Sequence, residues 1–115
     1  MRALVVDDSV VARAQIKKVL NEVISDLEID EASTAMDGIT KIRLAEYDIL
    51  TVDFNMPGGT GDTVIEQAKV KFPSAKIALL TANKQLPMKE KAEEWGIALL
   101  EKPHFQDALK EFLLA

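Results

Sequence analysis

Short apolar runs alternate with amphipathic segments five times along this chain of 115 residues. Each apolar run has the length of a buried strand. The residues after it repeat their apolar positions every three or four places, as one face of a helix does. The predicted strands lie at 3–6, 27–32, 48–52, 76–81 and 97–100. This alternation restricts the chain to a small set of folds.

The order of the predicted elements indicates a parallel sheet. Two parallel strands need a crossover connection between them, and a helix is the usual one. Successive crossover helices cover both faces of the sheet, so its strands are apolar on both sides. We therefore predict an α/β fold of the flavodoxin-like type, with a five-stranded parallel sheet in the order 2-1-3-4-5 and helices on both faces. We expect one domain, spanning residues 1–115.

Residues that start or stop helices stand between the predicted elements. Pro73 and Gly96 are expected to end the third and fourth helices. Gly38 lies inside the second helix, where glycine costs about 1 kcal/mol, so this helix is expected to depend on packing. Polar residues suited to capping a helix N-terminus precede the first three helices: Ser9, Ser33 or Thr34, and Thr60.

Composition excludes several classes of protein. No apolar run approaches the roughly 18 residues of a membrane span, and the first residues enter a strand pattern too soon for a secretion signal. The chain has no cysteine, which excludes disulfides and thiolate metal sites. Its net charge of -5 argues against direct binding of nucleic acid, which needs a basic surface. We therefore expect a cytoplasmic protein that binds neither membranes nor nucleic acid.

Polar residues follow or end four of the five predicted strands. Asp7 and Asp8 come directly after the first strand, and Asp53 comes directly after the third. Thr81 ends the fourth strand, and Lys102 follows the fifth. The carboxyl ends of parallel strands lie at one edge of a sheet, which is where ligands bind in open α/β folds. We therefore expect these five residues to converge on one rim.

Three carboxylates on one rim repel one another, and a divalent cation offsets that repulsion. Mg²⁺ is a good match, because it prefers oxygen ligands and commonly keeps several waters beside one or two protein carboxylates. An ammonium and a hydroxyl nearby favour a tetrahedral dianion, and a carboxylate can itself attack phosphorus to give an aspartyl phosphate. Asp53 is the candidate nucleophile, because it is central and Asp7 and Asp8 form a pair suited to the metal.

Each of these residues also has an ordinary structural explanation. Asp7 and Asp8 could cap the first helix, although Ser9 already serves that purpose. Thr81 could be a strand-end hydroxyl without a further role, and Lys102 could be a surface lysine. The residue types alone leave these alternatives open.

Four motifs together resemble a known family. Val-Val-Asp-Asp-Ser at 5–9, Asp53-Phe-Asn-Met-Pro-Gly, Thr81-Ala82 and Lys102-Pro103 stand in the order and approximate spacing of the receiver domain of two-component response regulators. The chain is similar to the single-domain chemotaxis type, and the resemblance covers its whole length. Lys-Pro or Asp-Asp alone would be a weak signal, whereas the combination is specific.

The resemblance implies a phosphoryl acceptor and a magnesium site. Asp53 would accept the phosphoryl group from a phosphohistidine of a sensor histidine kinase or histidine phosphotransfer protein. Asp8, Asp53 and the main-chain carbonyl of Asn55 would bind Mg²⁺, with Asp7 contributing directly or through water. Lys102 would pair with the phosphoryl oxygens.

The resemblance also implies a signalling output. Thr81 would hydrogen-bond the phosphoryl group and couple it to a change of the protein-binding surface. A downstream protein target would bind the fourth helix, fifth strand and fifth helix, and the protein would be a monomer or a phosphorylation-dependent dimer. Such a protein is not an enzyme, and it only assists its own phosphorylation and dephosphorylation. Whether it acts alone or as part of a longer protein is left open.

Several positions depart from the family pattern. Leu99 stands three residues before Lys102, where an aromatic residue usually acts with the threonine as a switch. His104 follows Lys102-Pro103, where phenylalanine is usual. Asn55 and Asn83 are not departures, since they match the two variable positions that are expected to tune autodephosphorylation. We therefore expect intact acceptor chemistry but a non-standard read-out at Leu99.

Two other functions compete with this interpretation. One is a phosphorylation-independent protein-interaction domain of the same fold, which Leu99 leaves open and the complete set of rim residues argues against. A Mg²⁺-dependent phosphohydrolase with an aspartate nucleophile usually needs a second carboxylate two residues after the nucleophile, and this chain has Asn55 there. The receiver is therefore the preferred interpretation.

Overall fold

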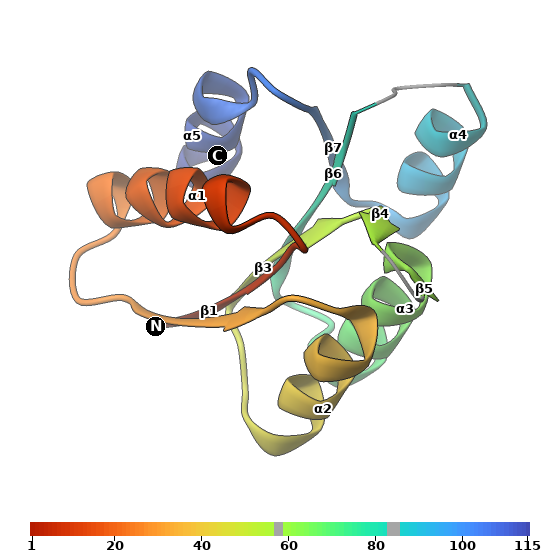
Figure 1. Cartoon of the computed structure of the whole chain (residues 1–115), viewed down its shortest axis with the longest axis horizontal. Coiled ribbons are helices and arrows are strands. Elements are labelled where there is room, and N and C mark those ends of the chain that lie inside the picture. The colour runs from red at the N-terminus through yellow and green to blue at the C-terminus, as the bar shows by residue number, and fades with distance from the viewer. Residues whose placement is uncertain (57–58, 83–85) are drawn as a thin grey trace.

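A parallel sheet runs through the middle of the molecule (Figure 1). The computed structural model describes residues 1–56, 59–82 and 86–115. Five parallel strands form the sheet in the order β2-β1-β3-β6-β7. Counted along the chain, this is the predicted order 2-1-3-4-5, so the flavodoxin-like α/β fold is confirmed. The strands are β1 Arg2–Val6, β2 Glu28–Ala32, β3 Ile49–Asp53, β6 Lys76–Thr81 and β7 Ala98–Glu101.

Helices cover both faces of the sheet, as predicted. One face carries two helices that pack side by side, and the other carries three (Figure 1). The first pair is α1 Val10–Val23 and α5 Gln106–Leu114; the second group is α2 Ala35–Leu44, α3 Gly61–Lys71 and α4 Leu86–Trp95. No helix in the described part of the chain has the length and apolarity needed to cross a membrane.

The local sequence explains where several helices begin and end. The side chains of Ser9 and Thr34 each accept a backbone N–H of the following first turn at 3.1 Å, so both act as N-caps. Helix α3 ends two residues before Pro73. Gly96 follows α4 with a φ of 68°, in the left-handed region that favours glycine. These boundaries agree with the sequence predictions, whereas the side chain of Thr60 lies outside the described residues.

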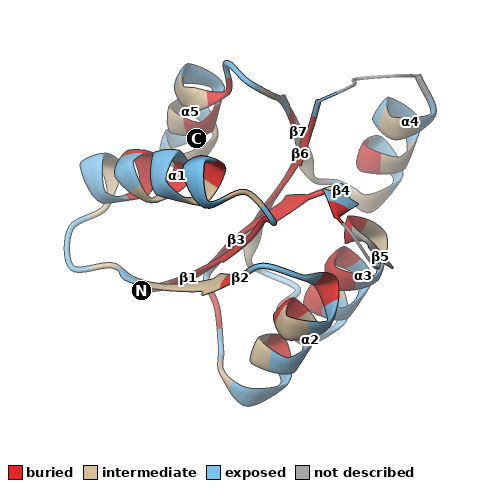
Figure 2. Cartoon of the chain, viewed as in Figure 1, coloured by how far each residue is buried: buried red, intermediate tan, exposed pale blue. Residues whose placement is uncertain are grey.

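Two apolar clusters fill the spaces above and below the sheet (Figure 2). Successive residues of the central strands alternate between them, because neighbouring side chains of a strand point to opposite faces. Leu4, Leu50 and Leu79 pack toward α2 and α3, whereas the strand residues that pack toward α1 and α5 are Ala3, Val5, Ile49, Ala78 and Leu80. Burial on both faces explains why these strands read as continuous apolar runs.

Gly38 shows how closely α2 approaches the sheet. A Cβ added at Gly38 would lie 3.1 Å from Cγ2 of Val6 in β1, which is tighter than ordinary van der Waals contact. Glycine at this position lowers the helix propensity of α2, but the absence of a side chain lets the helix pack closely on the sheet. This agrees with the expectation that packing stabilises α2.

The sequence patterns do not predict a second, two-stranded ribbon directly after β3. Its strands β4 Asn55–Met56 and β5 Gly59–Thr60 pair antiparallel. Strands of two residues are too short to show an apolar period, so the pattern reads as a loop. Strands β3 and β7 also lie one residue further along the chain than predicted, which makes Asp53 the last residue of β3 itself.

Thr51 provides a test of the core. It lies in the middle of β3, is 1% exposed, and its Oγ1 has no hydrogen-bond partner among the described residues. Thr51→Val keeps the side-chain shape and removes an unsatisfied hydroxyl, so we expect it to stabilise the protein by roughly 1 kcal/mol. Urea unfolding followed by circular dichroism measures the change.

The reverse substitution at the next position is the control. Val52 is fully buried, so Val52→Thr buries a new hydroxyl and should destabilise the protein by about 1 to 3 kcal/mol. A Thr51→Val variant that is less stable than the wild type would show that the hydroxyl has a partner.

Candidate functional site

Asp7 and Asp8 lie at the carboxyl end of β1. The Asp7 side chain is buried, and its backbone N–H donates to the Ala32 carbonyl at 2.9 Å, which extends the pairing of β1 with β2. Oδ1 of Asp7 accepts the backbone N–H of Ser9 at 2.9 Å. Asp8 is exposed. The end of β1 therefore presents one buried and one solvent-accessible carboxylate.

Asp53 ends β3, the strand next to β1 in the middle of the sheet, and is 4% exposed. Val6 of β1 pairs with Val52 of β3, so the residues that follow them are brought to the same edge. One carboxylate oxygen from each of Asp7, Asp8 and Asp53 lies within 4.8 Å of the other two. The structure thus brings together the three carboxylates that the sequence selects.

Lys102 supplies the positive charge of the rim. Its Nζ lies 2.7 Å from Oδ2 of Asp7 and 3.6 Å from Oδ2 of Asp53, and its side chain is 18% exposed. Its backbone N–H donates to the carbonyl of Thr81 at 2.8 Å, which aligns the ends of β6 and β7. Thr81 is itself buried beside the end of β3. The shorter distance shows that Lys102 pairs mainly with Asp7.

Burial and charge repulsion act together on Asp53. Burial, followed by the negative charge of Asp7, raises the pKa of Asp53 to about 6, although Lys102 opposes the shift. A hydrogen bond with the Asp8 side chain acts in the same direction as burial, and one from the backbone of Asn55 acts against it. The ammonium of Lys102 thus compensates only part of the negative charge at this rim.

The rim residues fit a hard divalent cation. Three carboxylate oxygens are close enough to share one ion, and among the described residues Lys102 is the ammonium group paired with them, so negative charge is in excess. Oxygen donors without sulfur or imidazole match Mg²⁺ rather than zinc or copper. Asn55 lies two residues beyond Asp53, at the start of β4, with its side chain exposed. Asn83 lies outside the described residues.

Gly61 holds the backbone after Asp53 in place. Its N–H donates to the carbonyl of Phe54 at 3.0 Å. A Cβ added at Gly61 would lie 2.7 Å from the backbone carbonyl oxygen of Asp53, which cannot yield as a flexible side chain would. Glycine therefore permits a close approach of α3 to the end of β3. This role is not visible in the sequence, because a glycine after a strand also fits an ordinary loop.

Arg13 is a further residue that the sequence analysis misses. The helical pattern assigns it to a face of α1 away from the core, yet its side chain is only 14% exposed. Its Nη1 donates to the backbone carbonyl of Asp7 at 2.6 Å. The signal that could have identified it is its position in the first turns of α1, from which a long side chain can fold back to the strand end.

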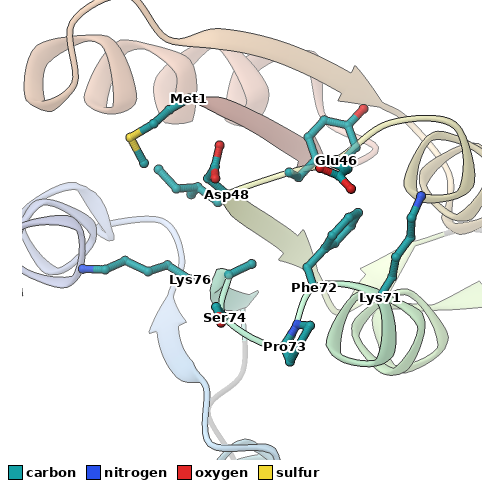
Figure 3. A pocket seen from close by; sticks show the side chains of 11 residues that line it. Met1, Glu46, Asp48, Lys71, Phe72, Pro73, Ser74 and Lys76 are labelled. Atoms are coloured by element: carbon teal, nitrogen blue, oxygen red, sulfur yellow. The ribbon is translucent and has the colours of Figure 1, made fainter.

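A hollow of about 450 Å³ lies away from this rim, at the opposite edge of the sheet (Figure 3). Its lining includes Glu46, Asp48, Phe72 and Lys76. Lys76 is already engaged, since its Nζ donates to the carbonyl of Phe112 at 3.1 Å. Among the described residues, the acidic group suited to a metal is the one at the rim. The acidic side chains of the rim, rather than the size of this hollow, therefore identify the candidate functional site.

The chain matches the response regulator receiver domain over residues 3–113, and it belongs to this family of two-component signalling modules. It is 33% identical over 111 residues to the sensor protein EvgS of Escherichia coli K12, an alignment that covers 96% of this chain and 9% of EvgS. It is 31% identical over 115 residues to the chemotaxis protein CheY of Listeria monocytogenes, covering 98% of this chain and 95% of CheY. The chain therefore spans about a tenth of one relative and nearly all of another.

Solved structures agree with this classification. The response regulator TrrA from Thermotoga maritima, crystallised in complex with Mg²⁺–BeF, superposes with a TM-score of 0.80 at 32% identity. The superposition covers 98% of this chain and 96% of TrrA. Receiver domains bind Mg²⁺ at an acidic pocket, and in this structure Asp7, Asp8 and Asp53 form an acidic cluster.

The raised pKa of Asp53 predicts a pH-dependent stability in the absence of metal. Its carboxyl has an ordinary pKa of 3.8 and a folded-state pKa of about 6, so its ionisation destabilises the fold as the pH rises through this window. Asp53→Asn removes that charge. We expect the variant to be more stable than the wild type at pH 7.5 by roughly 1 to 3 kcal/mol, with the difference vanishing near pH 4.

Urea unfolding in the presence of a chelator, at several pH values, measures this difference. Asp26→Asn is the matched control, because Asp26 is exposed and its left-handed backbone, with a φ of 57°, tolerates asparagine. A difference between wild type and Asp53→Asn that stays constant between pH 4 and about 7.5 would contradict the raised pKa.

Proposed function

We propose that residues 1–115 form one receiver domain that accepts a phosphoryl group on Asp53. The donor is a phosphohistidine of a sensor histidine kinase or histidine phosphotransfer protein. The observation that carries the proposal is the close grouping of three carboxylates with Lys102 at the carboxyl edge of the sheet. Membership of the receiver family supports the same assignment.

The transfer itself is a substitution at phosphorus. One carboxylate oxygen of Asp53 attacks, and a new O–P bond forms while the N–P bond to the donor histidine breaks. The electron pair of that bond returns to the imidazole nitrogen, which takes up a proton from solvent. The ionised form of Asp53 is the nucleophile, so interactions that favour its charged form also favour the transfer.

Mg²⁺ fits the excess negative charge of the rim. Asp7, Asp8, Asp53 and the main-chain carbonyl of Asn55 would hold it, with Asp7 acting directly or through water. When bound, the ion would neutralise the carboxylates and the oxygens of the incoming phosphoryl group. The grouping of the three carboxylates supports this ligand set.

Lys102 and Thr81 would receive the oxygens of the phosphoryl group. The ammonium of Lys102 already lies 3.6 Å from the Asp53 carboxylate, so a small movement away from Asp7 would bring it to a group bound there. Thr81 ends the strand next to β3, where its hydroxyl is suited to a hydrogen bond with that group. These two residues would stabilise charge rather than transfer protons.

The output surface would comprise α4, β7 and α5. Strand β7 is at the edge of the sheet and carries Leu99, which is half-buried and packs on the cluster beneath α2 and α3. Since Leu99 has no aromatic ring to rotate, the phosphorylated state would be read through movement of α4. The protein would bind a downstream protein target there, as a monomer or a phosphorylation-dependent dimer.

Acetyl phosphate tests the proposal without knowledge of the partner kinase. With Mg²⁺ present, we expect the wild type to gain the mass of one phosphoryl group, because acetyl phosphate offers the same phosphorus with a good leaving group. Asp53→Asn should not be labelled, and addition of a chelator should suppress labelling of the wild type. Intact-protein mass spectrometry at neutral pH measures each reaction.

Asp26→Asn is again the control and should be labelled as the wild type is. Equal labelling of Asp53→Asn and the wild type would overturn Asp53 as the acceptor. A wild type that binds Mg²⁺ but is never labelled would instead favour a phosphorylation-independent interaction domain.

A further inference from the structure

Asp7 is held through every polar group it has. Its N–H and Oδ1 take part in backbone hydrogen bonds with Ala32 and Ser9, each at 2.9 Å, and its Oδ2 accepts from Lys102 at 2.7 Å. The remaining group, its carbonyl oxygen, accepts Nη1 of Arg13 at 2.6 Å. This carbonyl belongs to the peptide that joins Asp7 to Asp8. A guanidinium group therefore fixes the peptide between the two acidic residues that follow β1.

Arg13 is itself oriented by a neighbouring strand. Its Nε donates to Oε1 of Glu31 in β2 at 3.0 Å, and Oε2 of Glu31 accepts Nζ of Lys17 at 2.9 Å. The guanidinium group is planar, so a bond at Nε restricts where Nη1 can point. Lysine has one nitrogen and cannot bridge two acceptors with this fixed geometry. The hydrogen bonds of Arg13 and Glu31 thus link α1, β2 and the end of β1, and we call this pair the bracket.

The bracket has a consequence for Asp8. A peptide unit is planar, so a fixed carbonyl at Asp7 also fixes the backbone nitrogen of Asp8 and the direction in which its chain starts. Asp8 is exposed and contributes to the group of three carboxylates. Metal ligands need such support, because a ligand that is free to turn binds its ion more weakly.

We propose that Arg13, oriented by Glu31, is a positioning residue that fixes the Asp7–Asp8 peptide and thereby holds the acidic rim in the arrangement that binds a divalent cation. The inference rests on the proposed function, since it assigns a role toward that metal. Arg13 is not a ligand and touches neither the metal nor the phosphoryl group. It acts through the backbone carbonyl of Asp7, whereas Lys102 contacts the Asp7 carboxylate.

A Mg²⁺ titration of single variants tests the proposal. Arg13→Met keeps the length of the side chain and removes its donors, and we expect the dissociation constant for Mg²⁺ to rise about tenfold, as is usual for residues that orient metal ligands. Lys17→Met is the matched control. It removes the other cation bound to Glu31 but no contact to Asp7, so affinity for Mg²⁺ should remain within about twofold of the wild type.

Nuclear magnetic resonance shifts of the backbone amides measure the affinity, and thermal unfolding without metal reports any loss of fold. Arg13→Lys is the second variant, because it keeps the positive charge and helix propensity and should still weaken Mg²⁺ binding. Glu31→Gln should weaken Mg²⁺ binding less than Arg13→Met does. The double variant of Arg13→Met and Glu31→Gln should bind Mg²⁺ no more weakly than Arg13→Met alone.

Three outcomes would overturn the positioning role. These are wild-type affinity in both Arg13 variants, equal loss in Lys17→Met, and additive losses in the double variant. Labelling by acetyl phosphate is measured separately in each protein. If the wild type binds Mg²⁺ but is not labelled, Asp53 is not a phosphoryl acceptor and the role of Arg13 is unaffected. If the wild type is labelled normally and the Arg13 variants bind Mg²⁺ as the wild type does, the positioning role alone is overturned.

Discussion

The electrostatic balance at the end of β1 and β3 is the constraint on which the functional part of this structure depends. Asp7 and Asp53 are both buried, and in the described part of the chain the ammonium group of Lys102 pairs with both. Removing Lys102 would leave Asp7 without its main partner. The fold would then lose stability, because an unpaired buried carboxylate is costly in free energy. Burial, and after it the negative charge of Asp7, raises the pKa of Asp53 to about 6, and a cation bound at the rim would offset this excess of negative charge.

The fold makes this concentration of charge possible. In a parallel sheet, strands far apart in sequence end at the same edge, and here β1, β3, β6 and β7 bring Asp7, Asp53, Thr81 and Lys102 together. Most residues of β1, β3 and β6 are apolar and buried between the two clusters, which anchors the charged ends. The stability lost at the rim is thus offset by packing elsewhere in the same strands.

Much of the fold and rim follows from local patterns, because strand and helix periods are strong signals and the parallel topology determines which strand ends meet. The ribbon of β4 and β5 does not follow, since two-residue strands have no period. The contact of Arg13 with the Asp7 carbonyl is also hidden, because a helical pattern sorts residues by polarity and cannot show that a long side chain folds back. The preference of Lys102 for Asp7 over Asp53 depends on tertiary distances of 2.7 and 3.6 Å, which no sequence motif contains.

A crystal structure of the wild type with Mg²⁺ and beryllofluoride would show whether Asp53 is the phosphoryl acceptor beside a bound metal ion. We expect beryllium bonded to a carboxylate oxygen of Asp53 and one Mg²⁺ among the three acidic side chains. We also expect Nζ of Lys102 to move from Asp7 to a fluorine atom. Beryllofluoride bound at another residue, or a rim that takes up neither ion while Lys102 stays on Asp7, would rule out Asp53 as the acceptor.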